Sequence, residues 1–184
     1  MKGMNSILMA RQKGTFSIEF SFVGLFFGVL LMFSADLIIK ISVKGKLDRL
    51  SYSLVNIAKE RTQLYAKEDY TLESDDIDLL YDVGKNSLNR TMGQFDDSKF
   101  SMFVEEMTND SGYQHYARGS ECNVSKTLND LESNDNTKLS VVTSWGRDSS
   151  VYRVTLCYET DNLVAGLLGN GFTTVQSGSV MIGR

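Results

Sequence analysis

The feature that most constrains this chain is an uncharged apolar run near its N-terminus. From Phe20 to Ala35 the sequence holds sixteen residues without a charge, and extending it back to Thr15 makes twenty-one, with Glu19 as the only ionisable side chain. A helix needs about 20 such residues, rising about 1.5 Å each, to cross the hydrocarbon core of a bilayer. No other stretch of the sequence comes close, so it predicts a single-pass membrane protein.

The charge distribution separates this head from the rest of the chain. Residues 1–49 carry seven bases and three acids, a net charge of +4, whereas residues 50–184 carry twelve bases and twenty acids, a net charge of −8. An acidic chain gives no support to a nucleic-acid binder that neutralises phosphates. The 184 residues allow about one compact domain beyond the membrane segment.

Three interpretations of the apolar run are open. A secretory signal peptide needs small residues at positions −3 and −1 of its cleavage site, and the best candidate, Phe33-Ser34-Ala35, places phenylalanine at −3. A plain signal anchor would remain uncleaved. The third interpretation depends on a short motif that precedes the run.

This motif combines a glycine with an acid inside the apolar segment. Gly14 stands just before the hydrophobic stretch, Glu19 follows five residues later, and the preceding residues carry the bases Lys2, Arg11 and Lys13. A carboxylate at mid-membrane costs about 2.5–3.5 kcal/mol, less near the interface, so such a residue suggests a function. The layout resembles the leader of type IV prepilins and pseudopilins, whose dedicated peptidase cuts after the glycine on the cytoplasmic side.

The resemblance implies that residues 1–14 are a leader and that the mature chain is 15–184. Cleavage between Gly14 and Thr15 would create a cation at Thr15, which the Glu19 carboxylate neutralises in the same or a neighbouring subunit. Flp-type pilins typically carry tyrosine after this glutamate, where Phe20 stands here, which argues against the major pilin. The implied location is the bacterial inner membrane with the C-terminal domain in the periplasm. The implied partners are the prepilin peptidase, other pilin-like subunits, inner-membrane pilus assembly proteins and the lipid bilayer.

Small residues follow one side of the expected membrane helix over 15–35. They recur at steps of four, three and four, and are Ser17, Ser21, Gly24 and Gly28. The two glycines form a GxxxG pair, which lets helix backbones approach closely in lipid. Either this face packs against the helices of other subunits, or it reflects only the abundance of glycine in membrane helices.

The helical pattern continues through residues 36–67 as an amphipathic stalk. Apolar residues at three- and four-residue steps make a stripe of about three heptads, consisting of Val43, Leu47, Leu50, Leu54, Ile57 and Leu64. Proline is absent, so nothing forces a kink. A helix over 15–66 would be roughly 75 Å long, with its first half in lipid and its second half packed against the soluble body.

The stalk also carries a family resemblance. Residues 47–57 (LDRLSYSLVNI) and 60–65 (ERTQLY) are similar to the corresponding region of TadF-like minor pseudopilins of the tight-adherence (Tad/Flp) pilus machinery. The resemblance covers the head, the stalk and, more loosely, the C-terminal part. It implies a long N-terminal helix, half in the membrane and half in a domain.

Residues 68–184 predict a small periplasmic α+β domain with an antiparallel sheet late in the chain. A helix is expected over 74–91, capped by Ser74 and stopped by Gly93, and a short second helix is expected after Asp97-Ser98. That second helix would carry Phe100, Phe103, Val104 and Met107. Residues 109–137 are expected to be mostly loop. Strands are expected over 139–145, 151–158 and 172–182, the last interrupted at Gly178, with a short helical piece over 162–168.

The two cysteines are Cys122, in the polar loop, and Cys157, on an expected strand. In an oxidising periplasm they would pair and close a loop of 34 intervening residues, whereas in the cytosol they would remain free thiols. The membrane topology favours the disulfide. The chain-entropy model gives roughly 3–4 kcal/mol of stabilisation for a loop of this size.

The sequence offers little support for catalysis. It contains no Gly-x-Ser-x-Gly, phosphate loop or His-Glu-x-x-His. His115 stands alone, and the acids between Glu73 and Asp82 lack the spacing of a calcium loop. We therefore expect no enzyme, cofactor or metal.

Two function classes remain. One is a processed minor pilin-like subunit, needed for assembly, initiation or capping of a Tad/Flp type IV pilus in adhesion and biofilm formation. The other is an uncleaved, signal-anchored periplasmic binding or sensory domain. The N-terminus of the chain in the membrane distinguishes them, because only the first class begins at Thr15.

Overall fold

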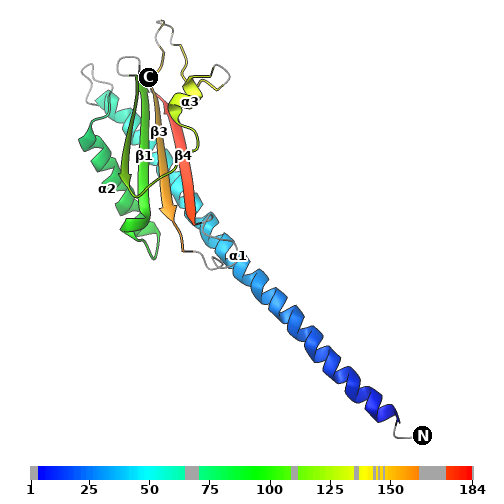
Figure 1. Ribbon diagram of the computed structural model, residues 1–184. Coiled ribbons are helices and arrows are strands. Elements are labelled where there is room, and N and C mark those ends of the chain that lie inside the picture. The colour runs from blue at the N-terminus through cyan, green and yellow to red at the C-terminus, as the bar shows by residue number, and fades with distance from the viewer. Residues whose placement is uncertain are drawn as a thin grey trace.

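One long helix carries a small domain at its far end (Figure 1). The computed structural model describes residues 4–64, 71–108, 112–134, 137–142, 144, 146, 148–161 and 173–183, and in the first helix the side chains of 16–60. The helices are α1 (Met4–Leu64), α2 (Ser74–Thr91), the 3₁₀ turn η1 (Asp97–Lys99) and α3 (Leu128–Glu132). The strands are β1 (Phe100–Thr108), β2 (Gly112–Gly119), β3 (Val151–Glu159) and β4 (Thr174–Ile182).

The four strands form one antiparallel sheet in the order β2-β1-β3-β4. Helices α1 and α2 pack against one face of the sheet, and α3 contacts β1 (Figure 1). Because side chains alternate between the two faces of a strand, β1 points Phe100, Met102 and Val104 toward the two long helices. The predicted α+β fold, a long N-terminal helix followed by an antiparallel sheet, is confirmed.

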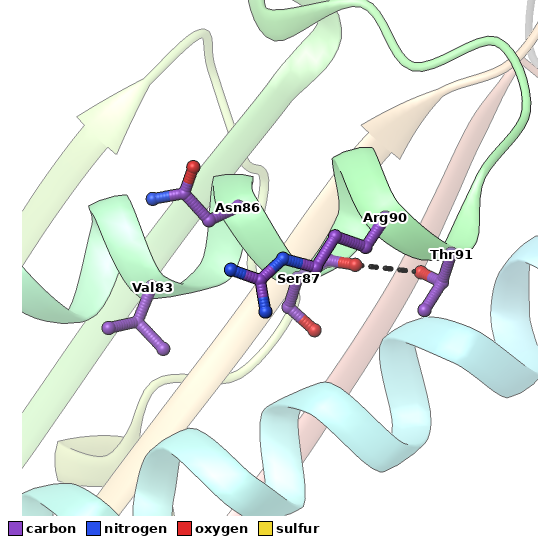
Figure 2. A pocket seen from close by; sticks show the side chains of 5 residues that line it. All are labelled: Val83, Asn86, Ser87, Arg90 and Thr91. Atoms are coloured by element: carbon purple, nitrogen blue, oxygen red, sulfur yellow. Dashed lines mark hydrogen bonds between the residues drawn. The ribbon is translucent and has the colours of Figure 1, made fainter.

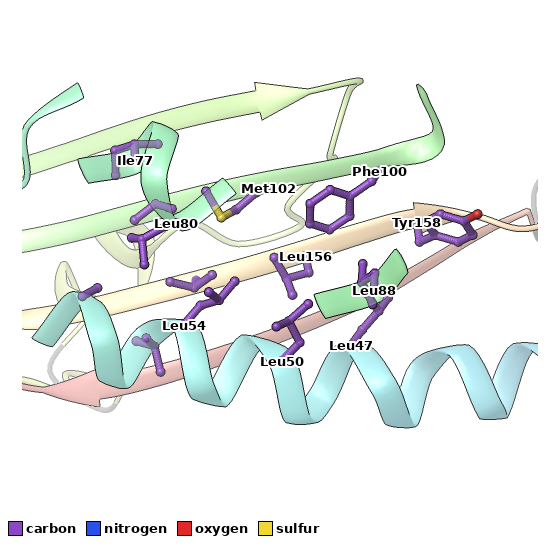
Figure 3. Packing of buried hydrophobic residues seen from close by; sticks show 14 of the residues in the cluster. Leu47, Leu50, Leu54, Ile77, Leu80, Leu88, Phe100, Met102, Leu156 and Tyr158 are labelled. Carbon is purple, nitrogen blue, oxygen red and sulfur yellow. The ribbon is translucent and has the colours of Figure 1, made fainter. Parts of the chain in front are cut away.

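The core lies between this sheet face and the two helices (Figure 3). Strand β3 adds Val154 and Leu156, α1 adds Leu54, and α2 adds Ile77 and Leu80. Burying a side chain of this size contributes about 1.5–3 kcal/mol. Packing therefore holds both helices to the sheet, and the C-terminal half of α1 is a core element of the domain.

Toward its C-terminal end, α1 buries a slightly different set of residues from the one predicted. The expected residues Val43, Leu47, Leu50 and Leu54 are buried, but Ile57 is 43% exposed. Val55 and Ala58 are buried in its place. The reason is that α1 packs closely along β4 as well as β3, so the buried face extends to the side of the helix on which Val55 lies.

The segment after Asp97 is a strand, and the predicted second helix is wrong. A single 3₁₀ turn forms there, capped by the Asp96 carboxylate, which accepts from Ser98 N at 3.0 Å. Phe100 then begins β1, which pairs with β2 on one side and with β3 on the other. Apolar residues occur on both faces of this central strand. Phe100, Phe103, Val104 and Met107 therefore follow one another at three- and four-residue steps, the spacing that is also typical of a helix face.

Other expectations divide between confirmation and correction. The helix over 74–91 and the strand over 151–158 are confirmed, although α2 is capped one residue earlier, by Glu73. Within residues 109–137, which were expected to be mostly loop, the structure places strand β2 and the short helix α3. In the segment 139–145, where a strand was expected, the described residues form one isolated bridge, Val142 with Asp148. Strand β4 continues through Gly178, which pairs with Thr155. The helical piece expected over 162–168 lies outside the described residues.

We expect Ile77→Val to lower the free energy of unfolding by about 1 kcal/mol, because it removes one methylene from a fully buried site. The matched control is Ile57→Val, the same change on the exposed side of α1. Urea denaturation of the detergent-extracted chain measures both. Equal effects of the two substitutions would contradict this packing.

Candidate membrane anchor and assembly surface

The N-terminal half of α1 exposes its apolar side chains. From Phe16 to Ala35 every side chain is exposed except the half-buried Ser34. The segment Phe16–Glu60 is long and apolar enough to cross a membrane by length and composition, and only 6% of its apolar 18-residue window is buried. A surface of this size and character must be covered by lipid or by other protein.

The predicted processing site lies within the same helix. Gly14 and Thr15 belong to α1, which begins at Met4 rather than at Thr15 as expected. A single glycine in a helix costs only about 1 kcal/mol, and nothing else in this segment breaks the helical path. Thr15 and Glu19 are four residues apart, so they lie on one side of α1, one turn from each other.

The four small residues predicted as a packing face are exposed together. Ser21 Oγ donates to Ser17 O at 2.8 Å, so this hydroxyl is satisfied within the helix, as lipid exposure requires. A Cβ added at Gly24 or Gly28 would meet no heavy atom within 4 Å. Within the described part of the chain, this face is therefore uncovered.

Polar contacts fasten α1 to the domain just beyond the apolar segment. Asp36 is only 3% exposed and pairs with Lys40 Nζ at 2.7 Å. Farther along, the Ser177 hydroxyl of β4 donates to Asp48, and Ser51 Oγ lies 2.8 Å from Ser179 Oγ. The contacts of Asp48 and Ser51 join α1 to the edge strand β4, whereas the Asp36–Lys40 pair lies within the helix.

The two cysteines form a disulfide. Cys122 and Cys157 have Cα atoms 5.6 Å apart, within the usual range for a disulfide. Cys157 is buried on β3, and Cys122 lies half-buried on the segment after β2. The bond therefore ties the connection between β2 and α3 to the sheet.

A buried carboxylate that the sequence analysis missed holds the same connection. Glu105 on β1 is fully buried and accepts from Tyr113 Oη at 3.0 Å and from Leu128 N at 2.7 Å. Arg153 Nη1 lies 3.4 Å from its second oxygen and donates to Lys126 O at 2.7 Å. A carboxylate held by these groups fixes α3 to the sheet. An acid in a strand gives no sequence signal for burial, because its partners come from other segments.

Burial raises the pKa of Tyr113 to about 12, and its hydrogen bond to Glu105 acts in the same direction. Because the folded pKa lies above the ordinary tyrosine pKa of 10.0, the stability that this contact contributes is present below pH 10.0 and is lost as the pH rises toward about 12. We expect Tyr113→Phe to remove the tyrosinate absorbance that develops near that upper value. Superimposable alkaline titrations of the two proteins would contradict this.

The remaining candidates for chemistry are sparse. No group of three or more His, Cys, Asp or Glu side chains that could hold a metal ion occurs among the described residues. His115 is exposed on β2, stacked on the Tyr113 ring at 5.7 Å. A hollow of about 330 Å³ lies on α2, on the side along which α1 passes (Figure 2). Its lining residues are Val83, Asn86, Ser87, Arg90 and Thr91. These five side chains provide no acid–base pair.

Comparison with known families resolves the identity of the chain. Residues 7–184 match the family model described as "TadF: Putative tight adherence pilin protein F". The chain belongs to the TadF family. The resemblance stated from the sequence is thereby confirmed. Searches of curated proteins and of solved structures found no match.

Membership in the TadF family makes this chain a pilin-like subunit of the tight-adherence pilus, whose partners are other pilus subunits. The pilin family and the single apolar helix described near the N-terminus fit a membrane-anchored protein. In this TadF-family member, the N-terminal half of α1 is exposed and apolar, and its C-terminal half forms part of the domain core.

Proposed function

We propose that this chain is a minor pilin-like subunit needed for assembly, initiation or capping of the Tad pilus, and hence for adhesion and biofilm formation. The prepilin peptidase removes residues 1–14, the segment 15–35 anchors the chain in the bacterial inner membrane, and the rest lies in the periplasm. The observation that carries the proposal is the continuity of α1, exposed and apolar in its first half and buried in the domain core in its second.

An exposed apolar half of α1 suits a subunit that moves from the lipid bilayer into an assembly of pilus subunits. Before assembly, lipid covers the apolar side chains between Phe16 and Ala35. In an assembly with other pilin-like subunits and inner-membrane assembly proteins, neighbouring helices replace the lipid, and the exposed Gly24 and Gly28 allow their backbones to approach.

The position of Glu19 supports cleavage after Gly14. The cut leaves a charged amine at Thr15, one helical turn from the Glu19 carboxylate. A cation beside a bilayer is stabilised by an opposite charge within a few ångströms. The Cys122–Cys157 disulfide supports a periplasmic domain, because such bonds persist in oxidising compartments.

Intact-mass measurement and N-terminal sequencing of the chain extracted from membranes test this function. We expect the mature chain to begin at Thr15, and the same chain from cells without the prepilin peptidase to begin at Met1. A chain that begins at Met1 in cells with the peptidase would instead support an uncleaved anchored domain with a binding or sensory role.

A further inference from the structure

The segment that carries Cys122 is held on the sheet by two contacts besides the disulfide. Arg153 Nη1 on β3 donates to Lys126 O at 2.7 Å. Glu105 Oε1 on β1 accepts from Leu128 N at 2.7 Å. Glu105 and Arg153 stand opposite each other in the pairing of β1 with β3, and their side chains are 0% and 16% exposed. Neither contact involves sulfur, so both can form while the two cysteines are still thiols.

These contacts place Cys122 within reach of Cys157. Arg153 and Cys157 are four residues apart on β3, on the same face of the sheet, which separates them by about 13 Å along the strand. Lys126 follows Cys122 by four residues, and four residues of extended chain span at most about 14 Å. A segment fastened at Lys126 therefore reaches far enough to lay Cys122 beside Cys157, where their Cα atoms are 5.6 Å apart.

The two cysteines differ in exposure. Cys157 is 2% exposed, on a strand with neighbours on both sides. Cys122 is half-buried and lies between the exposed residues Glu121 and Asn123. A thiol attacks an external disulfide only where that disulfide can approach it. In the folded, reduced domain such a disulfide therefore meets Cys122 first.

We propose that the domain folds before its disulfide closes, and that oxidation enters at Cys122 through a mixed disulfide with a thiol–disulfide oxidoreductase. The Cys122 thiolate attacks one sulfur of the oxidoreductase disulfide and releases the other sulfur as a thiolate. The Cys157 thiolate then attacks Cys122 Sγ and releases the second thiolate of the oxidoreductase. The chain loses two electrons and two protons, and the oxidoreductase leaves as a dithiol.

Glu105 and Arg153 are positioning residues for the second attack. Without their contacts, the two cysteines must close a loop of 34 intervening residues. With the contacts in place, the stretch still to be closed is the one between Cys122 and Lys126. The entropic cost of closing a loop grows with its length, and the 3/2-power dependence predicts closure more than about tenfold faster for the short stretch.

A short pulse of N-ethylmaleimide on the reduced, full-length chain in detergent tests the point of entry. Peptide masses give the labelling of both cysteines in one sample. We expect Cys122 to be labelled at least about tenfold faster than Cys157 in native buffer, and the two to be labelled equally in unfolding urea. Equal labelling in native buffer, or faster labelling of Cys157, would overturn the proposal, because the reduced domain would then be unfolded or Cys157 would be the accessible thiol.

Oxidation by glutathione disulfide tests the positioning residues. Glu105→Leu combined with Arg153→Met removes both contacts, and replacing a buried ion pair by apolar side chains of similar size is often neutral for stability. We expect attack on the glutathione disulfide by Cys122 to keep its rate. Closure from the glutathione adduct should slow by about tenfold, so that the adduct accumulates. In urea this difference in closure rate should vanish, because no folded contacts remain.

The matched control removes another ion pair by the same kind of change. Asp97→Leu combined with Lys85→Met acts between η1 and α2, on the side of the sheet opposite Cys157, and should leave both rates unchanged. Slowing in both double variants, or in neither, would refute the positioning role of Glu105 and Arg153.

This inference shares only the periplasmic location with the proposed function, and the two fail separately. The labelling and closure rates are measured on the domain and do not depend on the N-terminus of the chain. A chain that begins at Met1 would refute the processing and leave these rates as they stand. Equal labelling of the two cysteines in a chain that begins at Thr15 would refute only the route of oxidation.

Discussion

Replacing Glu19 by alanine is expected to leave the chain in the membrane but to impair its maturation or reduce pilus assembly by about tenfold or more. The substitution makes the apolar helix more hydrophobic, so insertion should persist. It removes the carboxylate one turn from the new amine at Thr15, which then remains unneutralised when a neighbouring helix approaches. The measurements are the N-terminal mass of the membrane chain and the amount of pili sheared from cells.

Two controls separate charge from other effects. Glu19→Gln keeps the size of the side chain and should behave like Glu19→Ala if charge is the cause. Glu60→Ala removes an exposed acid from the far end of α1 and should leave both readouts unchanged. Normal maturation and normal pili in Glu19→Ala cells would refute the proposed role of this carboxylate.

Breaking the disulfide is the second substitution with a large expected effect. In Cys122→Ala the closed segment, with a sequence separation of 35, is released from β3. The loss of loop constraint in the unfolded chain predicts a decrease of roughly 3–4 kcal/mol in the free energy of unfolding. Denaturation of the extracted chain in urea, with and without the substitution, measures this difference.

Reduction provides the matched control for the disulfide. A thiol reductant should destabilise the natural chain by a similar amount and have no further effect on Cys122→Ala. Because Cys157 remains in place in this variant, the result is not confused with a cavity at the buried position. A variant as stable as the oxidised natural chain would show that the bond does not constrain the fold.

The sequence predicted the elements whose burial follows a simple period. The stripe through Leu47 and Leu54 indicated the second half of α1, and the alternation in 151–158 indicated β3. Strand β1 was misassigned because the partners of a central strand lie far away in sequence and bury both of its faces. Strand β2 was missed because it is an edge strand whose outward residues, such as His115 and Ala117, are exposed.

The candidate site likewise has one part that a local sequence pattern indicates and one part that depends on contacts between distant segments. The glycine, the acid and the apolar run stand close together in sequence, so Gly14, Glu19 and the membrane segment formed a recognisable pattern. The Glu105 contacts depend on Tyr113, Leu128 and Arg153, three residues that only the folded sheet and α3 bring together. No local pattern in the sequence marks that carboxylate as buried.

The unbroken course of α1 has a mechanical consequence. From Met4 to Leu64 the helix contains no described interruption, and its C-terminal half packs directly on β3 and β4 with α2 at its side. A stiff rod clamped at one end transmits torque and axial force without a joint to absorb them. Any twist or lift applied to the N-terminal half of α1 therefore reorients the whole domain as one body.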